Sequence, residues 1–225
     1  MNFLISKNMP ENAKKKLSYL GTVFEATECN ISDKSIAGHP DLQIHFVSEN
    51  TAFCPKELYG YFKRTLPEYI DLFCGKSNLK GTYPDCCAYN IARINKTVIC
   101  NERYADIHIL DYYCKHNFRI INVNQGYTKC NICYLPDASV LTEDDGIYRQ
   151  LLKNNIQVCK IDVGDVRLDG YEYGFIGGAT GLFDNKILYS GKISKQLFDF
   201  NKKHGFEYIE LCDDELTDFG SILTF

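Results

Sequence analysis

Short apolar runs and amphipathic stretches alternate along the whole chain, in an order that recurs about every 44 residues. The starts of the repeat lie 44, 44, 48 and 44 residues apart. They are HPDLQIHFV from His39, YPDCCAYNI from Tyr83, YTKCNICYL from Tyr127, FIGGATGLF from Phe175 and FGSILTF from Phe219. We expect each start to form a strand. A fixed period of this length indicates a repeat architecture.

The segments that follow each start predict the rest of the unit. After the third start, SVLT predicts a strand, EDDGIYRQLLKNN a helix with acids in its first turn, and IQVCKIDVG a buried strand. The same order recurs in TVIC, NERYADIHILDYYCKHN and FRIINV; in KILYSG, KISKQLFDFNKKHG and FEYIEL; and in TAFC, PKELYGYFKRT and YIDLFCG. Each unit therefore reads strand, strand, helix, strand.

The fifth unit has only its first strand before the end of the sequence, and its remainder stands at the other end. NFLIS predicts the second strand, NMPENAKKKLSYLG the helix and TVFEATE the last strand. We therefore expect the two termini to meet inside one unit and to close a ring without exposed sheet edges. The predicted fold class is α/β, a five-bladed propeller formed by one domain over residues 1–225. Its modules cover approximately 39–82, 83–126, 127–174, 175–218, and 219–225 together with 1–38.

Composition narrows the range of partners. The chain has 225 residues and a net charge of −4, which gives no electrostatic reason to expect nucleic acid or an anionic membrane as a partner. No apolar run approaches the ~18 residues of a membrane span, and the first residues lack the pattern of a signal peptide. Eleven cysteines, an odd number, indicate reduced thiols in a cytoplasmic protein, most of them buried as small hydrophobic groups. The sequence does not indicate an oligomeric state.

The first start carries four polar side chains at alternating positions. On a strand, His39, Asp41, Gln43 and His45 share one face. Phe46 follows them. A strand face with two imidazoles and a carboxylate is a candidate for acid–base chemistry.

The third position of each unit gives a second candidate set. If these residues surround the axis, two carboxylates and an amine converge on one axial cavity, beside a glycine that leaves room for a ligand. The residues are Asp41, Asp85, Lys129, Gly177 and Ser221. The set suits a zwitterionic or amino-acid-like ligand; alternatively, Lys129 only neutralises the two acids.

Two further motifs argue against a metal or a cofactor. Cys130 and Cys133 spell C-x-x-C, but residues three apart on a strand point to opposite faces and do not share a zinc ion. GFIGGATG is rich in glycine but lacks the Lys-Ser/Thr of a phosphate loop. We therefore predict no metal and no cofactor.

Four motifs, GHPD, QGYTKCN, GFIGGATG and LTDFGSI, resemble those of a clostridial-type family of unknown function (domain of unknown function 6873). The resemblance spans essentially the whole chain. It implies the pentein fold, also called the guanidino-group-modifying enzyme (GME) fold, in which five modules surround a pseudo-fivefold axis. Members of that superfamily include arginine and agmatine deiminases, dimethylarginine hydrolases, amidinotransferases and a non-catalytic ribosome anti-association factor. The fold therefore leaves the function open.

The resemblance also implies a chemistry. In pentein enzymes a cysteine thiolate attacks the guanidinium carbon, a histidine moves protons, and carboxylates hold the cation. GHPDLQIHF matches the agmatine deiminase-like G-H-x-D motif, which makes His39 the acid–base and Asp41 a substrate ligand. Cys130 matches a nucleophile two modules after the histidine. Strand parity favours Cys133 instead, and Cys87 is a further alternative.

Two departures from the enzymes leave two functions open. The last segment, DFGSILTF, lacks the cysteine that the enzymes carry near the C-terminus, and Ile176 and Ala179 stand where the enzymes' E-G-G-D motif has acids. The first hypothesis is a cysteine-dependent hydrolase or transferase acting on a guanidine or amidine group of a small amino-acid-like substrate, with Asp85 helping Asp41 to bind the cation. The alternative is a non-catalytic protein that binds a small metabolite in the axial cavity or a macromolecule on its surface.

Overall fold

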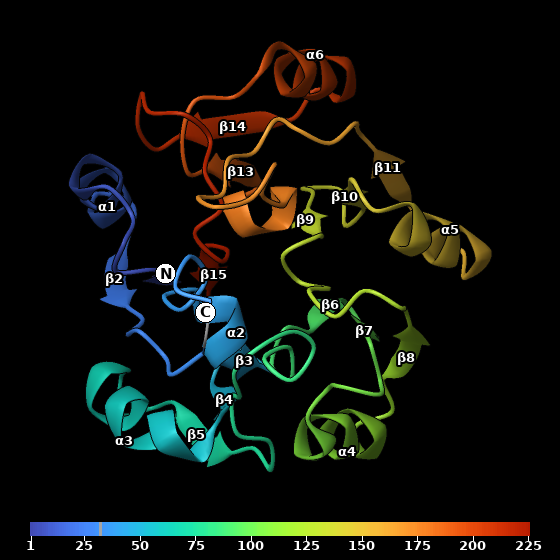
Figure 1. Cartoon of the computed structure of the whole chain (residues 1–225). Coiled ribbons are helices and arrows are strands. Elements are labelled where there is room, and N and C mark those ends of the chain that lie inside the picture. Colours follow the sequence, from blue (N-terminus) through green and yellow to red (C-terminus); the bar gives the residue numbers. More distant parts are fainter. Residues whose placement is uncertain (32) are drawn as a thin grey trace.

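A computed structural model describes residues 1–31 and 33–225. In this part of the chain, five three-stranded sheets surround a central axis, and a helix covers the outside of each (Figure 1). The order of elements in every unit is strand, strand, helix, strand. The predicted five-bladed α/β propeller is confirmed.

Each sheet has an inner, a middle and an outer strand. The inner strands are β3 (His45–Phe46), β6 (Ala92–Ile94), β9 (Cys133–Tyr134), β12 (Thr180–Phe183) and β15 (Leu223–Thr224). The middle strands are β1 (Asn2–Ile5), β4 (Thr51–Cys54), β7 (Thr97–Cys100), β10 (Val140–Thr142) and β13 (Lys186–Tyr189). The outer strands are β2 (Thr22–Glu25), β5 (Asp71–Cys74), β8 (Arg119–Asn122), β11 (Val158–Lys160) and β14 (Glu207–Glu210). Inner and middle strands run antiparallel, whereas middle and outer strands run parallel.

A parallel strand pair needs a crossover, and one helix per unit supplies it. These helices are α1 (Glu11–Ser18), α3 (Lys56–Thr65), α4 (Ile107–Lys115), α5 (Asp145–Lys153) and α6 (Lys195–His204). Three of them begin where a side chain caps the first turn, because Asp106, Asp144 and Ser194 each accept a hydrogen bond from a backbone N–H. Within the described ranges, no helix has both the length and the apolar character needed to cross a membrane.

The two ends of the sequence complete one sheet, as predicted. β15 pairs antiparallel with β1, with Phe3 opposite Thr224 and Leu4 opposite Leu223. The backbone N–H of Asn2 also donates to the carbonyl oxygen of Phe225. Both termini accordingly lie close together near the axis (Figure 1). The ring is closed by hydrogen bonds between its first and last strands.

One strand prediction is wrong in its burial. IQVCKIDVG, predicted as a buried strand, contributes β11, whose residues are exposed or half-buried. β11 is an outer strand and pairs on one side only, with β10. The middle strands, which have a partner on each side, are buried except for a half-buried first residue in four of them.

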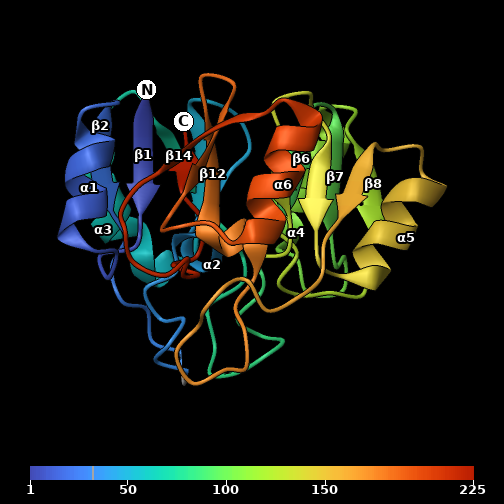
Figure 2. The same ribbon diagram turned by 90° about the horizontal axis from the view of Figure 1, so that it is seen from above.

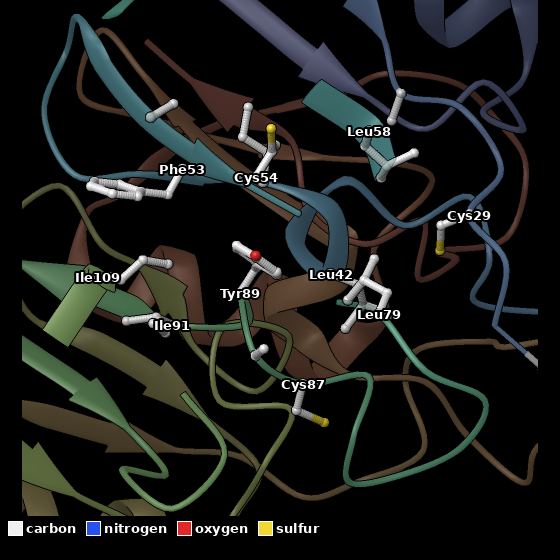
Figure 3. Close-up of a cluster of buried hydrophobic side chains, with 14 of the residues drawn as sticks. Cys29, Leu42, Phe53, Cys54, Leu58, Leu79, Cys87, Tyr89, Ile91 and Ile109 are labelled. Atoms are coloured by element: carbon white, nitrogen blue, oxygen red, sulfur yellow. The ribbon is translucent and has the colours of Figure 1, made fainter. Parts of the chain in front are cut away.

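The largest buried cluster combines residues of the first two complete units with residues from the N-terminal segment, and it includes several thiols. Figure 3 shows Cys29, Cys54 and Cys87 among aliphatic and aromatic side chains of this cluster, including Leu58 and Tyr89. Eight of the eleven cysteines are buried, and all eleven are free thiols. The expectation that most cysteines act as small hydrophobic groups is confirmed.

Candidate active site

Two cavities lie on opposite sides of the turns that precede the inner strands. The smaller, about 70 Å³, is lined by residues that come before the inner strands, among them His39, Cys130, Asp218 and four aromatic side chains. The larger, about 340 Å³, is lined mainly by the inner strands and the loops after them. We call them the loop-end and the strand-end cavity, because long connecting loops gather at one end of the axis (Figure 2).

The first unit does not start as the strand that alternation predicts. Pro40 opens a single helical turn, α2 (Pro40–Gln43), and only His45 and Phe46 form strand β3. Proline favours the first position of a helix, where its missing N–H costs nothing. The prediction that His39, Asp41, Gln43 and His45 share one strand face is therefore wrong.

The turn separates these four side chains. His39 lines the loop-end cavity, whereas Asp41 and His45 line the strand-end cavity. The Gln43 amide donates to the backbone carbonyls of Thr27 and Ala37, which gives it a structural contact. His45 Nε2 lies 2.6 Å from the hydroxyl of Tyr113 in the core.

Cys130 is buried beside groups from three different units. Its thiol donates to Asp41 Oδ2 at 3.1 Å, and its Sγ accepts from Asn90 Nδ2 at 3.2 Å. Asn90 also accepts the backbone N–H groups of Lys129 and Cys130 through Oδ1. His39, Asp41 and Cys130 each place one ligand-type atom within 4.8 Å of the other two. The structure thus brings the predicted nucleophile, acid–base and carboxylate together.

A polar cluster from four units surrounds the Ser221 hydroxyl. The Ser221 hydroxyl lies 2.6 Å from Asp41 Oδ2 and 2.8 Å from the carbonyl oxygen of Gly177, and it accepts from Lys129 Nζ at 3.0 Å. Four of the five predicted third-position residues therefore meet on the axis. The fifth, Asp85, lies exposed in a turn outside both cavities. We name Asp41, Ser221, Lys129 and Gly177 the axial layer.

Asp218 supplies a second carboxylate close to His39. Its Oδ1 is 3.7 Å from His39 Nδ1, and its two oxygens accept the backbone N–H groups of Gly220 and Phe175. A Cβ on Gly178 would lie 1.9 Å from Asp218 Oδ1. Glycine at 178 is therefore what allows this carboxylate to reach the site.

Burial sets the resting charges of the site. Burial, with the charges of Asp41 and Asp218, raises the pKa of the Cys130 thiol well above its ordinary value. Burial lowers the pKa of His39 and raises the pKa of Asp218 to about 6. At neutral pH, the resting site holds a protonated thiol beside a neutral imidazole.

Cys133 does not lie with the site groups. It stands in β9 and packs in the second hydrophobic cluster with Leu141 and Ile176. Burial raises the pKa of its thiol to about 11. The parity argument that favoured Cys133 fails because Cys130 lies in the turn before β9, where strand alternation does not apply. The C-x-x-C pair therefore splits between the site and the core.

Two site residues, Asn90 and Asp218, were not predicted from the sequence. Asp218 immediately precedes the fifth start, where the other units have glycine or threonine, so its carboxylate was a readable signal. Asn90 was hidden by a shift in the second unit, whose inner strand begins three residues later after its start than β3 and β9 do after theirs. That shift also explains why Asp85 does not reach the axis.

Five strand-strand-helix-strand units closed around an axis define the pentein fold, the fold of guanidino-group-modifying enzymes. Two solved structures share it. The chain matches SxtG, an amidinotransferase from Microseira wollei in the saxitoxin biosynthetic pathway, with a TM-score of 0.58 and 10% identity over 95% of this chain and 88% of that one. It matches an adduct of dimethylarginine dimethylaminohydrolase with 4-chloro-2-hydroxymethylpyridine with a TM-score of 0.51 and 9% identity over 93% and 91% of the two chains. At such identities the likeness shows the fold alone.

Within this fold, the chain belongs to a family of unknown function (DUF6873), whose sequence profile matches residues 4–223. The predicted resemblance to this family is confirmed. The comparison with curated proteins yields no match.

Proposed function

We propose that this protein is a cysteine-dependent hydrolase or transferase that acts on a guanidine or amidine group of a small substrate. The observation that carries the proposal is the meeting of Cys130, His39, Asp41 and Asp218 beside the loop-end cavity. These are the groups that guanidino chemistry requires: a nucleophile, a proton carrier and carboxylates for the cation.

The loop-end cavity suits a small planar cation. Its volume is about 70 Å³, and its walls include the aromatic rings of Tyr127, Tyr171 and Phe175. Aromatic faces attract cations, and buried carboxylates need positive partners. Asp41 Oδ1 is buried without a hydrogen-bond partner among the described residues. Asp41 itself lines the strand-end cavity, so the carboxylate that faces a guanidinium inside the loop-end cavity is Asp218.

The substrate's charge activates the nucleophile in this proposal. Asp41 and Asp218 raise the pKa of the Cys130 thiol, and a bound cation offsets their negative potential and lowers that pKa. The thiol proton then passes to His39, the Sγ–C bond forms, and the C–N bond to the leaving amine breaks as His39 protonates that amine. In the second step, water or an acceptor amine adds to the carbon, the C–S bond breaks, and the proton that the entering group loses restores the thiol. An enzyme with a free catalytic thiol suits a reducing compartment such as the cytoplasm.

A non-catalytic binding protein is the second candidate. It is favoured by Ser221, which stands in the last unit where pentein enzymes carry cysteine, and by the protonated resting state of the Cys130 thiol. In that case the loop-end cavity binds a small cationic metabolite and releases it unchanged.

A pair of alkylating probes separates the two candidates. Chloroacetamidine carries an amidinium, whereas chloroacetamide is a neutral analogue of the same size. If the protein is the proposed enzyme, peptide mapping of the eleven cysteines should find Cys130 modified selectively. Chloroacetamidine should modify it at least about tenfold faster than chloroacetamide does. His39→Ala and Asp41→Ala should abolish that preference, and Cys133→Ser is the matched control that should keep it.

The opposite outcome is slow labelling spread over the exposed thiols of Cys74 and Cys114, with no preference for the amidine. That result would contradict the enzyme hypothesis. If Cys130 is selectively labelled, guanidino compounds should next be screened for release of ammonia, an amine or urea. Selective labelling without turnover of any compound favours the binding protein.

A further inference from the structure

The strand-end cavity is a separate compartment that the proposed chemistry does not use. It holds about 340 Å³, within the usual range for small-molecule sites, and opens between the loops that follow the inner strands. Two residues of the axial layer, Asp41 and Lys129, are in its lining. Cys130, His39 and Asp218 do not line it; they line the loop-end cavity.

Two cations face this cavity without an acidic partner. Among residues 1–31 and 33–225, no carboxylate oxygen lies within 4.0 Å of a side-chain nitrogen of Arg93 or Lys129. Arg93 Nη1 donates to the backbone carbonyl of Val47. Lys129 is only 7% exposed, and its ammonium donates to Ser221 at 3.0 Å and lies 4.9 Å from the ring centre of Tyr134. Burial lowers the pKa of Lys129, the Asp41 carboxylate beyond Ser221 opposes that shift, and a bound anion would further favour the charged ammonium.

The other ionisable groups leave the cavity with a net positive lining. Burial, with the charges of Arg93 and Lys129, lowers the pKa of His45 to about 3, so its imidazole is neutral. Asp41 is the one carboxylate in the lining, against two cations. Tyr134 adds a donor, because its hydroxyl oxygen already accepts the backbone N–H of Arg93 at 2.9 Å and its O–H is free to donate to a ligand.

Apolar side chains form the remaining walls. They include Ile44, Ile91, Ile94, Leu135 and Ile222, with Phe46 near the mouth. A ligand that fills this space needs a compact apolar body as well as a charged end, because a fully hydrated ion leaves these walls in contact with water.

We propose that the strand-end cavity is a second ligand site, distinct from the Cys130 site, for a small carboxylate with an apolar body. The carboxylate meets Arg93, Lys129 and the Tyr134 hydroxyl, and the apolar body lies against the isoleucines. The two sites share Asp41, which lines this cavity and also accepts a hydrogen bond from the Cys130 thiol at Oδ2. The second site does not depend on whether Cys130 is catalytic.

The test uses 3-(4-fluorophenyl)propanoate as probe and its neutral amide as control, with binding followed by ¹⁹F NMR titration of the full chain. We expect saturable binding of the carboxylate, with the amide at least about tenfold weaker. Arg93→Gln should weaken the carboxylate at least about tenfold, the effect of losing one charged hydrogen-bonded contact. Arg103→Gln, which removes an exposed arginine over Tyr104 away from the cavity, should change nothing.

Two further variants keep the test decisive. Leu182→Trp places a bulky ring in the cavity wall and should block binding in a folded protein, as judged by circular dichroism. Cys130→Ser should bind the probe as the wild type does, which separates this site from the proposed active site. The proposal is overturned if the folded wild type shows no saturable binding at roughly 10 mM probe, a concentration above the Kd of even a weak site. It is also overturned if Arg93→Gln and Leu182→Trp bind normally, or if Cys130→Ser abolishes binding.

Discussion

Gly220 is the position where a single methyl group should report on the geometry of the candidate active site. Its φ is +79°, and a Cβ built there would lie 2.3 Å from the Cβ of His39. Its carbonyl oxygen accepts the backbone N–H of Asp41, so the backbone at 220 is held in place. We therefore expect Gly220→Ala to move His39 and to destabilise the fold.

The magnitude follows from two separate costs. An L-residue at positive φ costs about 1–2 kcal/mol. Forcing extra volume into a packed interior costs about 1–3 kcal/mol more. Gly220→Ala should thus lower the free energy of unfolding by about 2–5 kcal/mol. Gly205 is a matched control: its φ is +71°, but a Cβ there meets nothing within 4 Å, so Gly205→Ala should show only the first cost.

Urea denaturation of both variants gives the comparison, with the free energies read from transitions of equal slope. The Gly220 variant should also lose the preference of Cys130 for the amidine probe, whereas the Gly205 variant should keep it. If the two variants are destabilised equally, the contact between Gly220 and His39 is not tight, and the reasoning fails.

Three other predictions concern charge and buried polar contacts. Asp41→Asn removes a negative charge that raises the pKa of the Cys130 thiol. A pH profile should therefore show faster alkylation by neutral chloroacetamide near pH 8 and a weaker preference for the amidine. An unchanged profile would mean that Asp41 does not raise this pKa. Burial raises the pKa of Glu143 to about 7, so the folded protein binds more protons than the unfolded chain between about pH 4.5 and 7, and the free energy of unfolding falls as pH rises through that window. Glu143→Gln should remove up to about 3 kcal/mol of that fall in the free energy of unfolding, measured by urea denaturation at pH 5 and pH 8. An identical pH dependence in the wild type and the variant would contradict this prediction. Tyr113→Phe leaves His45 without its 2.6 Å partner and should cost about 1–3 kcal/mol in the same assay, and a loss below 0.5 kcal/mol would contradict it.

The repeat made most of the fold predictable. The middle strands and the outer helices recur at the same offsets, and their apolar periodicity comes from burial against the same neighbours in each unit. Closure was also readable, since the seven residues from Phe219 complete the unit that begins at the other end of the sequence. These features depend on pattern repeated over many residues, which tolerates local error.

The inner strands were the elements that the sequence predicted least accurately, because they are short and follow turns. β3 has two residues, and a strand of two residues leaves no alternation to detect. The apparent alternation of His39 to His45 belongs to a turn that Pro40 opens, and glycines at 177 and 178 similarly precede β12 in a turn, η1 (Ile176–Ala179). In the first unit, Asp41 lies in the turn and His39 immediately before it, and sequence spacing does not fix the direction of side chains in such a turn.

The candidate site itself depends on contacts between units that no local pattern encodes. Cys130 and Asp41 could be proposed from a motif, but the placement of Asn90 between them follows from a register shift in the second unit. The separation of Cys130 from Cys133 likewise follows from where β9 begins. Sequence reasoning named most of the groups and missed how the turns distribute them over two cavities.

The segment that closes the ring also supplies residues of the candidate site. Asp218, Gly220 and Ser221 all lie in the segment that leads into β15, and β15 holds its place by pairing with β1. The Ser221 N–H donates to the Gly178 carbonyl, and the Gly220 carbonyl accepts from Asp41, so the last unit joins the fourth and the first directly at the axis. We expect opening of the β15–β1 pair to loosen the segment that brings Asp218 to His39 and Ser221 to Asp41. Loss of the amidine preference of Cys130 should consequently coincide with disruption of the terminal strand pair, even while the other four sheets remain folded.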